Sequence, residues 1–182
     1  WDIKAKLLGV PVYELFGGPL RDRQRLYWSH CATARAGHHA LIGVPPLRTM
    51  DDVARLGEEV VRRGFTALKT NIVYPGDPAS VYFPGFQGGP GTTDQNATPA
   101  LIDHIRKLIG TFRAAVGNDC DIALDLNFNF KPEAAARICQ ALEEFNPMWV
   151  EIDLYDPVAL RQVKESTKVP ICSGENLYGL RG

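Results

Sequence analysis

The sequence lacks several patterns that would assign it to a specialised class of protein. Its 182 residues carry 20 Lys and Arg against 21 Asp and Glu, so the formal net charge of −1 gives no electrostatic reason to bind nucleic acid or an anionic membrane. No apolar run reaches the roughly 18 residues needed to cross a bilayer, and no signal-peptide pattern is visible. These absences predict a soluble cytoplasmic protein with no nucleic-acid and no membrane partner.

Cysteine is scarce and scattered. The four cysteines, at positions 31, 120, 139 and 172, form no C-x-x-C pair. Free, buried thiols are therefore expected rather than a metal or redox motif. The glycine fingerprint G-x-G-x-x-G also follows neither of the first two predicted strands, which argues against a dinucleotide-binding site.

What the sequence does contain is an alternation of strand-like and helix-like segments. The predicted strands are 25–32, 66–73, 122–127, 149–153 and 169–176. The predicted helices are 50–63, 99–116, 132–145 and 158–168, with Ser/Thr/Asp caps or Pro at several starts and a loop at 34–46. This alternation predicts an α/β fold with parallel strands and crossover helices. An open doubly wound sheet and part of a (β/α)8 barrel both satisfy it.

The chain is shorter than a complete barrel. It begins inside a helical pattern that Gly17-Gly18-Pro19 ends, and a (β/α)8 barrel normally needs about 250 residues. We therefore expect a longer protein. Because five strands of a barrel leave two unpaired edges, residues 1–182 alone are predicted to be poorly soluble or molten.

One long stretch, 74–97, shows no regular pattern. It is rich in Gly and Pro and holds the aromatic residues Tyr74, Tyr82, Phe83 and Phe86. Loops of this length in a compact domain are usually functional or disordered, and aromatic residues argue against disorder. The stretch is predicted to be a lid that faces a substrate or partner, with a plain surface excursion as the alternative.

Three carboxylates stand at or near the ends of successive predicted strands. Asp125, Glu151 and Glu175 have similar separations, and a helical pattern fills each gap. Parallel strands joined in this way deliver such residues to the same end of the sheet. Converging carboxylates repel one another unless a cation lies between them, and Mg²⁺ prefers oxygen ligands. The sequence therefore predicts a Mg²⁺ site, although any single strand-end acid could be a helix cap or a surface charge.

Other polar residues near the strand ends are candidates for chemistry or binding. Lys69 is the lysine suitably placed on a strand, and a lysine beside a divalent cation has a lowered pKa and can act as a general base; a solvent-facing lysine is the alternative. Asn71, Asn127 and Asn176 are candidate substrate-binding residues, with Asn127 expected on the face of Asp125 by strand alternation.

Three further residues lie close to these positions. Asp153 shares a face with Glu151 by the same alternation. Asp156 is better explained as a helix cap. His30 ends the first predicted strand and could reach the site, with a structural role as the alternative.

Taken in order, these motifs resemble the enolase superfamily, in its mandelate racemase / muconate lactonizing enzyme branch. Residues 1–18 look like the segment that leads from the capping domain into the barrel. Asp125-Leu-Asn127, Glu151-Ile-Asp153 and Gly174-Glu-Asn176 look like the three metal-binding strand ends. Lys69 matches the first lysine of the Lys-x-Lys motif, whereas Asn71 stands where the second lysine is expected.

The resemblance implies a modified (β/α)8 barrel of which only about the first five units are present, with residues 1–18 ending the capping region and 19–182 forming a partial barrel. It implies abstraction of the proton α to a carboxylate, with the enediolate stabilised by Mg²⁺. An acid-sugar dehydratase is the first expectation, because one base and one acid suffice. A racemase, epimerase or cycloisomerase is the alternative, and a non-catalytic relative that keeps the barrel is the rival. The expected partners are a small carboxylate substrate and, at full length, further copies of the protein.

Overall fold

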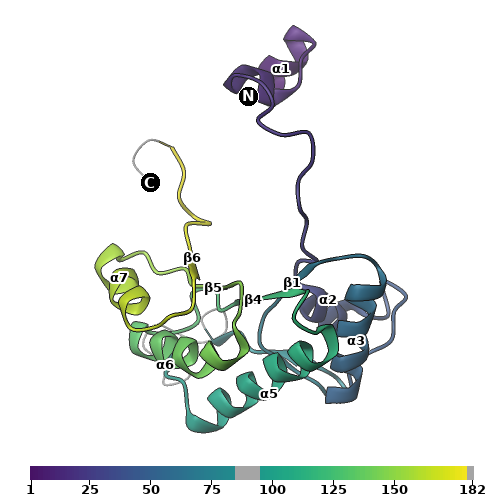
Figure 1. Cartoon of the computed structure of the whole chain (residues 1–182), viewed down its shortest axis with the longest axis vertical. Coiled ribbons are helices and arrows are strands. Elements are labelled where there is room, and N and C mark those ends of the chain that lie inside the picture. Colours follow the sequence, from purple (N-terminus) through teal and green to yellow (C-terminus); the bar gives the residue numbers. More distant parts are fainter. Residues whose placement is uncertain (85–94, 180–182) are drawn as a thin grey trace.

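The computed structural model describes residues 1–84 and 95–179 and has a parallel sheet at its centre (Figure 1). Four strands pair in the order β1 (Ala67–Thr70), β4 (Asp121–Asp125), β5 (Trp149–Glu151) and β6 (Ile171–Cys172). All three pairings are parallel. The spatial order equals the chain order, whereas a doubly wound sheet changes direction at a switch point. The described strands therefore follow the barrel alternative.

Helices precede β1 and connect the successive strands, and they lie along one side of the sheet (Figure 1). They are α3 (Met50–Arg62), α5 (Pro99–Val116), α6 (Pro132–Leu142) and α7 (Pro157–Glu165), with a short 3-10 turn η3 (Glu143–Phe145) after α6. Each helix of this series packs on the next one. The core between helices and sheet is apolar and fully buried, as at Leu56, Phe112, Leu124 and Ile138. No helix in the described ranges combines the length and the apolar content needed to cross a bilayer.

The predicted helix starts are confirmed because their signals are local. The Thr49 side chain accepts a hydrogen bond from the Asp52 N–H, and the Asp52 carboxylate accepts one from the Thr49 N–H. The Thr98 and Asp156 side chains cap α5 and α7 by accepting from the N–H groups of Leu101 and Val158. Caps satisfy the backbone N–H groups that a first helical turn leaves unpaired, so they set these starts without help from the rest of the fold.

The predicted first strand, 25–32, is wrong in most of its length. It pairs only at a single parallel bridge between Trp28 and Leu68. His30 then adopts a left-handed φ of 52°, and α2 (Cys31–His38) begins directly after it. The predicted loop 34–46 is thus partly helix. The alanine-rich start of α2 favours a helix, and that preference outweighs the aromatic, strand-like pattern before it.

The predicted second strand, 66–73, is divided. β1 ends at Thr70, while β2 (Val73–Tyr74) pairs antiparallel with β3 (Ser80–Val81) in a separate two-stranded sheet. The beginning of the predicted irregular stretch 74–97 is therefore a hairpin. The Tyr74 ring stacks on His104 of α5, with centroids 3.9 Å apart. Phe86 lies outside the described residues, and the lid role remains a prediction.

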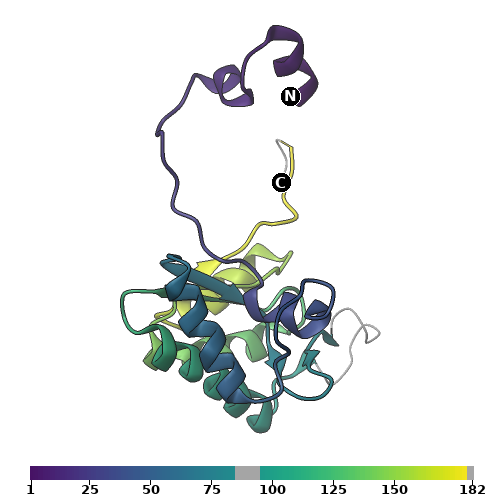
Figure 2. The same ribbon diagram turned by 90° about the vertical axis from the view of Figure 1, so that its right-hand side faces the viewer.

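The first residues form a separate small unit. α1 (Asp2–Leu8) and the 3-10 helix η1 (Val12–Phe16) pack on each other, with the Trp1 and Phe16 ring centroids 4.6 Å apart. Figures 1 and 2 show this unit held away from the sheet at the end of an extended segment.

The four cysteines are free, as predicted. Cys31, Cys120 and Cys139 are buried, whereas Cys172 is only half-buried. Burial raises the pKa of the Cys31 and Cys139 thiols to about 12, so these two groups are inert packing residues.

Candidate metal and substrate site

The candidate site lies at the carboxyl ends of the parallel strands. Asp125 and Glu151 are the last residues of β4 and β5, and the strand register places them opposite each other. Lys69 is the third residue of the four-residue β1, and Glu175 follows β6 after a short turn. The chain order of the strands thus gathers side chains that are far apart in the sequence.

The Lys69 ammonium lies between two carboxylates. Its Nζ is 2.8 Å from Oε2 of Glu151 and 3.0 Å from Oδ2 of Asp125. All three residues are buried, with 6%, 9% and 2% of their surfaces exposed. Buried charges are tolerated when they are paired in this way. Lys69 is therefore the internal counterion of the two strand-end acids, and the alternative of a solvent-facing lysine is wrong.

This pairing decides the charge state of Lys69. Burial lowers the pKa of its ammonium, but the hydrogen bonds and charges of Glu151 and Asp125 outweigh burial and raise the pKa above its ordinary value. The direction is opposite to the lowering that a neighbouring divalent cation would cause. Paired with these acids, the Lys69 ammonium is stabilised in its protonated form.

A second group of carboxylates adjoins this pair. Glu151, Asp153 and Glu175 each offer an oxygen atom, and these atoms all lie within 4.8 Å of one another. In an octahedral Mg²⁺ site with bonds of about 2.1 Å, neighbouring ligand atoms are roughly 3 Å apart and opposite ones roughly 4 Å. The oxygen donors suit such a cation, and the upper limit of 4.8 Å on their separations lies close to this spacing. Asp125 is outside this group and is connected to it through Lys69.

Asp153 was predicted to share a face with Glu151, and it lies beside Glu151, but it was not among the predicted site residues. It is 6% exposed, and burial followed by the charges of Glu175, Glu151 and Asp125 raises the pKa of its carboxyl. The Glu175 backbone N–H acts in the opposite direction and favours the charged form of the carboxyl. The alternation in Glu151-Ile-Asp153 was the signal that could have identified it.

Asn71 and Asn127 bond to the protein itself. The Asn71 Nδ2 donates to the backbone O of Asp125 and to Oδ1 of Asn127, both at 3.0 Å, and its Oδ1 accepts from Thr33 at 2.8 Å. Asn71 is 2% exposed, so it presents no free group to a ligand. Asn127 follows the end of β4 in a left-handed conformation with φ 51°. Strand alternation therefore does not decide where its side chain lies.

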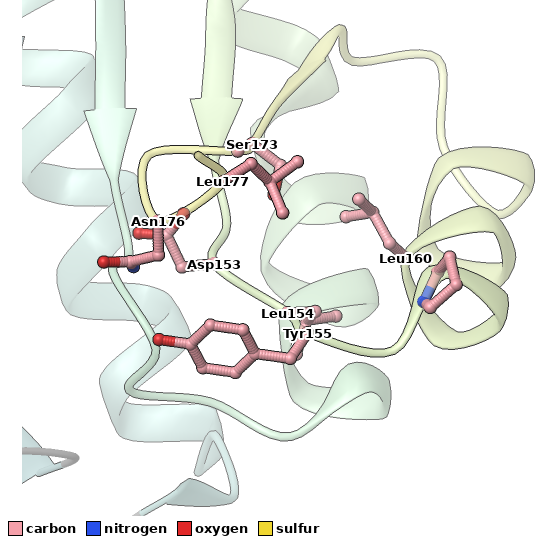
Figure 3. A pocket seen from close by; sticks show the side chains of 9 residues that line it. Asp153, Leu154, Tyr155, Leu160, Ser173, Asn176 and Leu177 are labelled. Carbon is pink, nitrogen blue, oxygen red and sulfur yellow. The ribbon is translucent and has the colours of Figure 1, made fainter. Parts of the chain in front are cut away.

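Asn176 lines a pocket of about 580 Å³ beside the carboxylates (Figure 3). Its polar lining comes from Asp153, Tyr155, Ser173 and Asn176, and its apolar lining comes from Leu154, Pro157, Leu160 and Leu177. The volume is in the range of small-molecule sites. Asp153 belongs to both the pocket and the carboxylate group, so the two are continuous.

His30 also reaches the site. Its Nε2 lies 3.8 Å from Oδ2 of Asp125, and its Nδ1 is 2.6 Å from the Ser29 hydroxyl oxygen. The distance to Asp125 is too long for a hydrogen bond. His30 therefore borders the Asp125 carboxylate without fixing it.

Comparison with known proteins agrees with this geometry. Residues 52–182 match the enolase C-terminal domain-like family. The chain belongs to that family. The resemblance to the mandelate racemase / muconate lactonizing enzyme branch is thereby confirmed, as is the parallel α/β barrel architecture expected from it.

Related proteins are considerably longer. A D-galactonate dehydratase family member from Halomonas elongata is 30% identical over 96% of this chain and 42% of its own length. A D-gluconate dehydratase from Thermoproteus tenax is 31% identical over 100% of this chain and 31% of its own length. A candidate L-alanine-DL-glutamate epimerase from Burkholderia xenovorans strain LB400, bound to magnesium and fumarate, is 43% identical, with a TM-score of 0.89 over 99% of this chain and 45% of that one. The chain thus spans less than half the length of these relatives.

Proposed function

We propose that the protein containing this chain is an enzyme that removes the proton α to a carboxylate in a Mg²⁺-dependent reaction, acting as an acid-sugar dehydratase. The observation that carries the proposal is the buried Lys69 ammonium between Asp125 and Glu151 at the strand ends, with Asp153 and Glu175 beside it. So many acids around one cationic side chain are costly unless further positive charge joins them.

Asp125, Glu151 and Glu175 are proposed as the ligands of the cation. Asp153 is proposed to support them, because one of its carboxylate oxygens lies within 4.8 Å of oxygens of Glu151 and Glu175. When bound, Mg²⁺ would supply the positive charge that stabilises negative charge developing on a substrate carboxylate. The magnesium in the 43% identical relative supports this choice of metal.

Lys69 is proposed as the catalytic proton carrier. Loss of water from an acid sugar needs one group to accept the α-proton and another to protonate the departing hydroxyl group. Protonated and held between two acids, Lys69 has a proton to give at Nζ. In the opposite role, as a base, it would first have to lose the two carboxylate contacts that raise its pKa.

The substrate is proposed to be a small carboxylate, an acid sugar or hydroxy acid, with Asn176 as a binding residue. The 580 Å³ pocket between the turn after β6 and the start of α7 supports this size, and Asp153 and Tyr155 add polar groups to its lining. Asn71 and Asn127 are proposed to contribute indirectly, because their amides are engaged within the protein.

An epimerase or racemase is the second candidate. The specific observation in its favour is the candidate L-alanine-DL-glutamate epimerase at 43% identity, which exceeds the 30–31% of the dehydratases named above. The dehydratase remains the first choice, because racemisation needs a base on each face and Asn71 stands in place of a second lysine.

The organisation of the whole protein is also a proposal. Residues 1–18 are proposed to end a capping region and residues 19–182 to form the partial barrel, which the separate packing of α1 and η1 supports. A homo-oligomer is proposed for the full-length protein.

Incubation in D₂O separates these functions. The intact protein with Mg²⁺ is given a panel of acid sugars and amino-acid derivatives, and products are followed by NMR. Loss of water to a 2-keto product supports the dehydratase, and deuterium at the α-carbon without loss of water supports the epimerase. If Mg²⁺ binds but neither change occurs with any compound of the panel, the result favours a non-catalytic relative.

A further inference from the structure

We propose that Asn71 is a positioning residue, which holds the Asp125 carboxylate in the orientation that a cation requires, and that Thr33 of α2 in turn holds Asn71. The inference rests on the proposed function, since it takes Asp125 as a cation ligand. It gives a role to the amide that stands where the resemblance leads one to expect a second lysine.

Asn71 connects the end of β1 to the end of β4. One hydrogen of its amide goes to the backbone O of Asp125 and the other to Oδ1 of Asn127, both over 3.0 Å. Both donors are thus committed to the segment that carries Asp125. Because Asn71 is 2% exposed, water does not compete for these bonds.

Thr33 decides which way the Asn71 amide faces. Its hydroxyl donates to Oδ1 of Asn71 at 2.8 Å, and its oxygen accepts the Asn71 backbone N–H at 3.2 Å. An amide can be turned over, so a donor on one side fixes the NH₂ group on the other side. A lysine has no acceptor atom and could not receive the Thr33 hydroxyl. The site is thus built for a neutral amide.

Asn127 connects the Asn71 amide to the Asp125 carboxylate. Its φ of 51° lies in the left-handed region, which costs free energy for a residue other than glycine. In that conformation its backbone N–H donates to Oδ1 of Asp125 at 2.9 Å. The hydrogen bond from Asn71 to the Asn127 side chain holds the strained turn in place. Asp125 is therefore fixed through Oδ1 by Asn127, while Oδ2 faces Lys69.

The test measures Mg²⁺ affinity by titration calorimetry on the intact protein. Second-layer hydrogen bonds typically change metal affinity by 10- to 100-fold, so Asn71→Ala is expected to weaken binding about tenfold. Asn127→Gly alone removes the oxygen that accepts from Asn71 but also removes the strain, because glycine adopts the left-handed conformation freely, so it should weaken binding less than Asn71→Ala does. For the same reason, Asn127→Gly added to Asn71→Ala should restore part of the lost affinity. A general loss of stability would not be repaired in this way.

A milder variant guards against misfolding. Thr33→Val removes the hydroxyl at almost constant size and should weaken Mg²⁺ binding several-fold. Thr167→Val is the control: Thr167 is buried whereas Thr33 is half-buried, and its hydroxyl likewise donates to a side chain, Glu143 at 3.0 Å, but it lies before β6, at the other end of the sheet. The Mg²⁺ affinity of Thr167→Val should equal that of the wild type.

Three outcomes overturn the inference. It fails if folded Asn71→Ala or Thr33→Val binds Mg²⁺ as tightly as the wild type. It also fails if Asn127→Gly restores nothing to Asn71→Ala, because Asn71 would then act by another route. If the wild type itself does not bind Mg²⁺, the proposed function falls and the inference falls with it, which distinguishes the two failures.

Discussion

The ammonium of Lys69 and the carboxylate of Glu151 lie 2.8 Å apart, although 82 residues separate them in the chain and β4 lies between their strands. Together with Asp125, this pair forms a buried cluster in which the Lys69 ammonium is the counterion of two carboxylates.

Lys69→Met should destabilise the metal-free protein strongly. Removing one partner of a buried ion pair typically costs about 3–5 kcal/mol, because the remaining charges are left uncompensated. Mg²⁺ should recover more stability in Lys69→Met than in the wild type, since the ion replaces the lost positive charge. Urea unfolding with and without Mg²⁺ measures both effects. Lys107→Met, at an exposed position on α5, is the control; equal stability of the two variants would refute the counterion role.

Asp125→Asn should weaken Mg²⁺ binding by more than Asp153→Asn does. Asp125 is proposed to bind the ion directly, whereas Asp153 is proposed to support the ligands, and an indirect contribution is worth about 10- to 100-fold in affinity. Calorimetric titration of both variants ranks them, with the exposed Asp119→Asn as the unaffected control. The reverse order would move the cation to the group formed by Glu151, Asp153 and Glu175.

Asp52→Asn should lower stability in a pH-dependent way. Burial would raise the pKa of Asp52, but hydrogen bonds from Arg55, Thr49 and Arg48 outweigh it and lower the pKa from 3.8 to about 2. Because the pKa is depressed in the folded state, the stabilisation is complete above pH 3.8 and disappears as the pH falls through 2. Loss of such a cap costs about 1 kcal/mol. In urea unfolding, the difference in free energy between the wild type and Asp52→Asn should therefore be about this large at pH 7 and smaller at pH 3. A difference that stays constant with pH would contradict the lowered pKa of Asp52.

Arg113→Ala should destabilise the far end of the barrel. The Arg113 guanidinium on α5 donates to the backbone O atoms of Phe145, Gly117, Cys120 and Asn146, over 2.7 to 3.3 Å. Hydrogen bonds to a charged group are worth about 1.5–3 kcal/mol, so a loss of about 2 kcal/mol is expected in thermal or urea unfolding.

Arg106→Ala is the matched control for Arg113→Ala. Arg106 also lies on α5, but its ion pair with Glu144 is about half exposed. Exposed pairs contribute about 0–1 kcal/mol, so this variant should unfold almost as the wild type does. Similar losses in the two variants would show that the carbonyl contacts of Arg113 are not decisive.

Gly57→Ala and Gly37→Ala should have opposite effects on stability. A Cβ at Gly57 of α3 would lie 2.8 Å from Cβ of Ala115 and 3.3 Å from Cγ1 of Val116, where α3 packs on α5. Overpacking typically costs about 1–3 kcal/mol, which exceeds the roughly 1 kcal/mol that alanine gains over glycine in a helix. At Gly37 of α2 a Cβ would meet nothing within 4 Å, so Gly37→Ala should be stabilising. The unfolding midpoints of the two variants, compared with the wild type, test this prediction. Midpoints that shift in the same direction in both variants would refute the packing argument.

Part of the site was open to sequence reasoning. The positions of Asp125 and Glu151 at strand ends follow from apolar runs that stop at a carboxylate, and the shared face of Glu151 and Asp153 follows from strand alternation. The partners of Asn71 were not predictable in this way. Thr33 precedes it by 38 residues, on a helix that the strand-like pattern before it concealed.

By itself, the sequence determined the β/α alternation, the caps at Thr49, Thr98 and Asp156, the family, and the set of acids at the strand ends. These depend on neighbouring residues and on the period of each element. Tertiary structure alone decided that Lys69 pairs with Asp125 and Glu151, and that Asn71 bonds within the protein. The physical reason is that the sequence pattern of a helix or strand determines on which face, and near which end of that element, a side chain lies. Hydrogen bonding between strands decides which elements become neighbours, and thus which charges share a buried space.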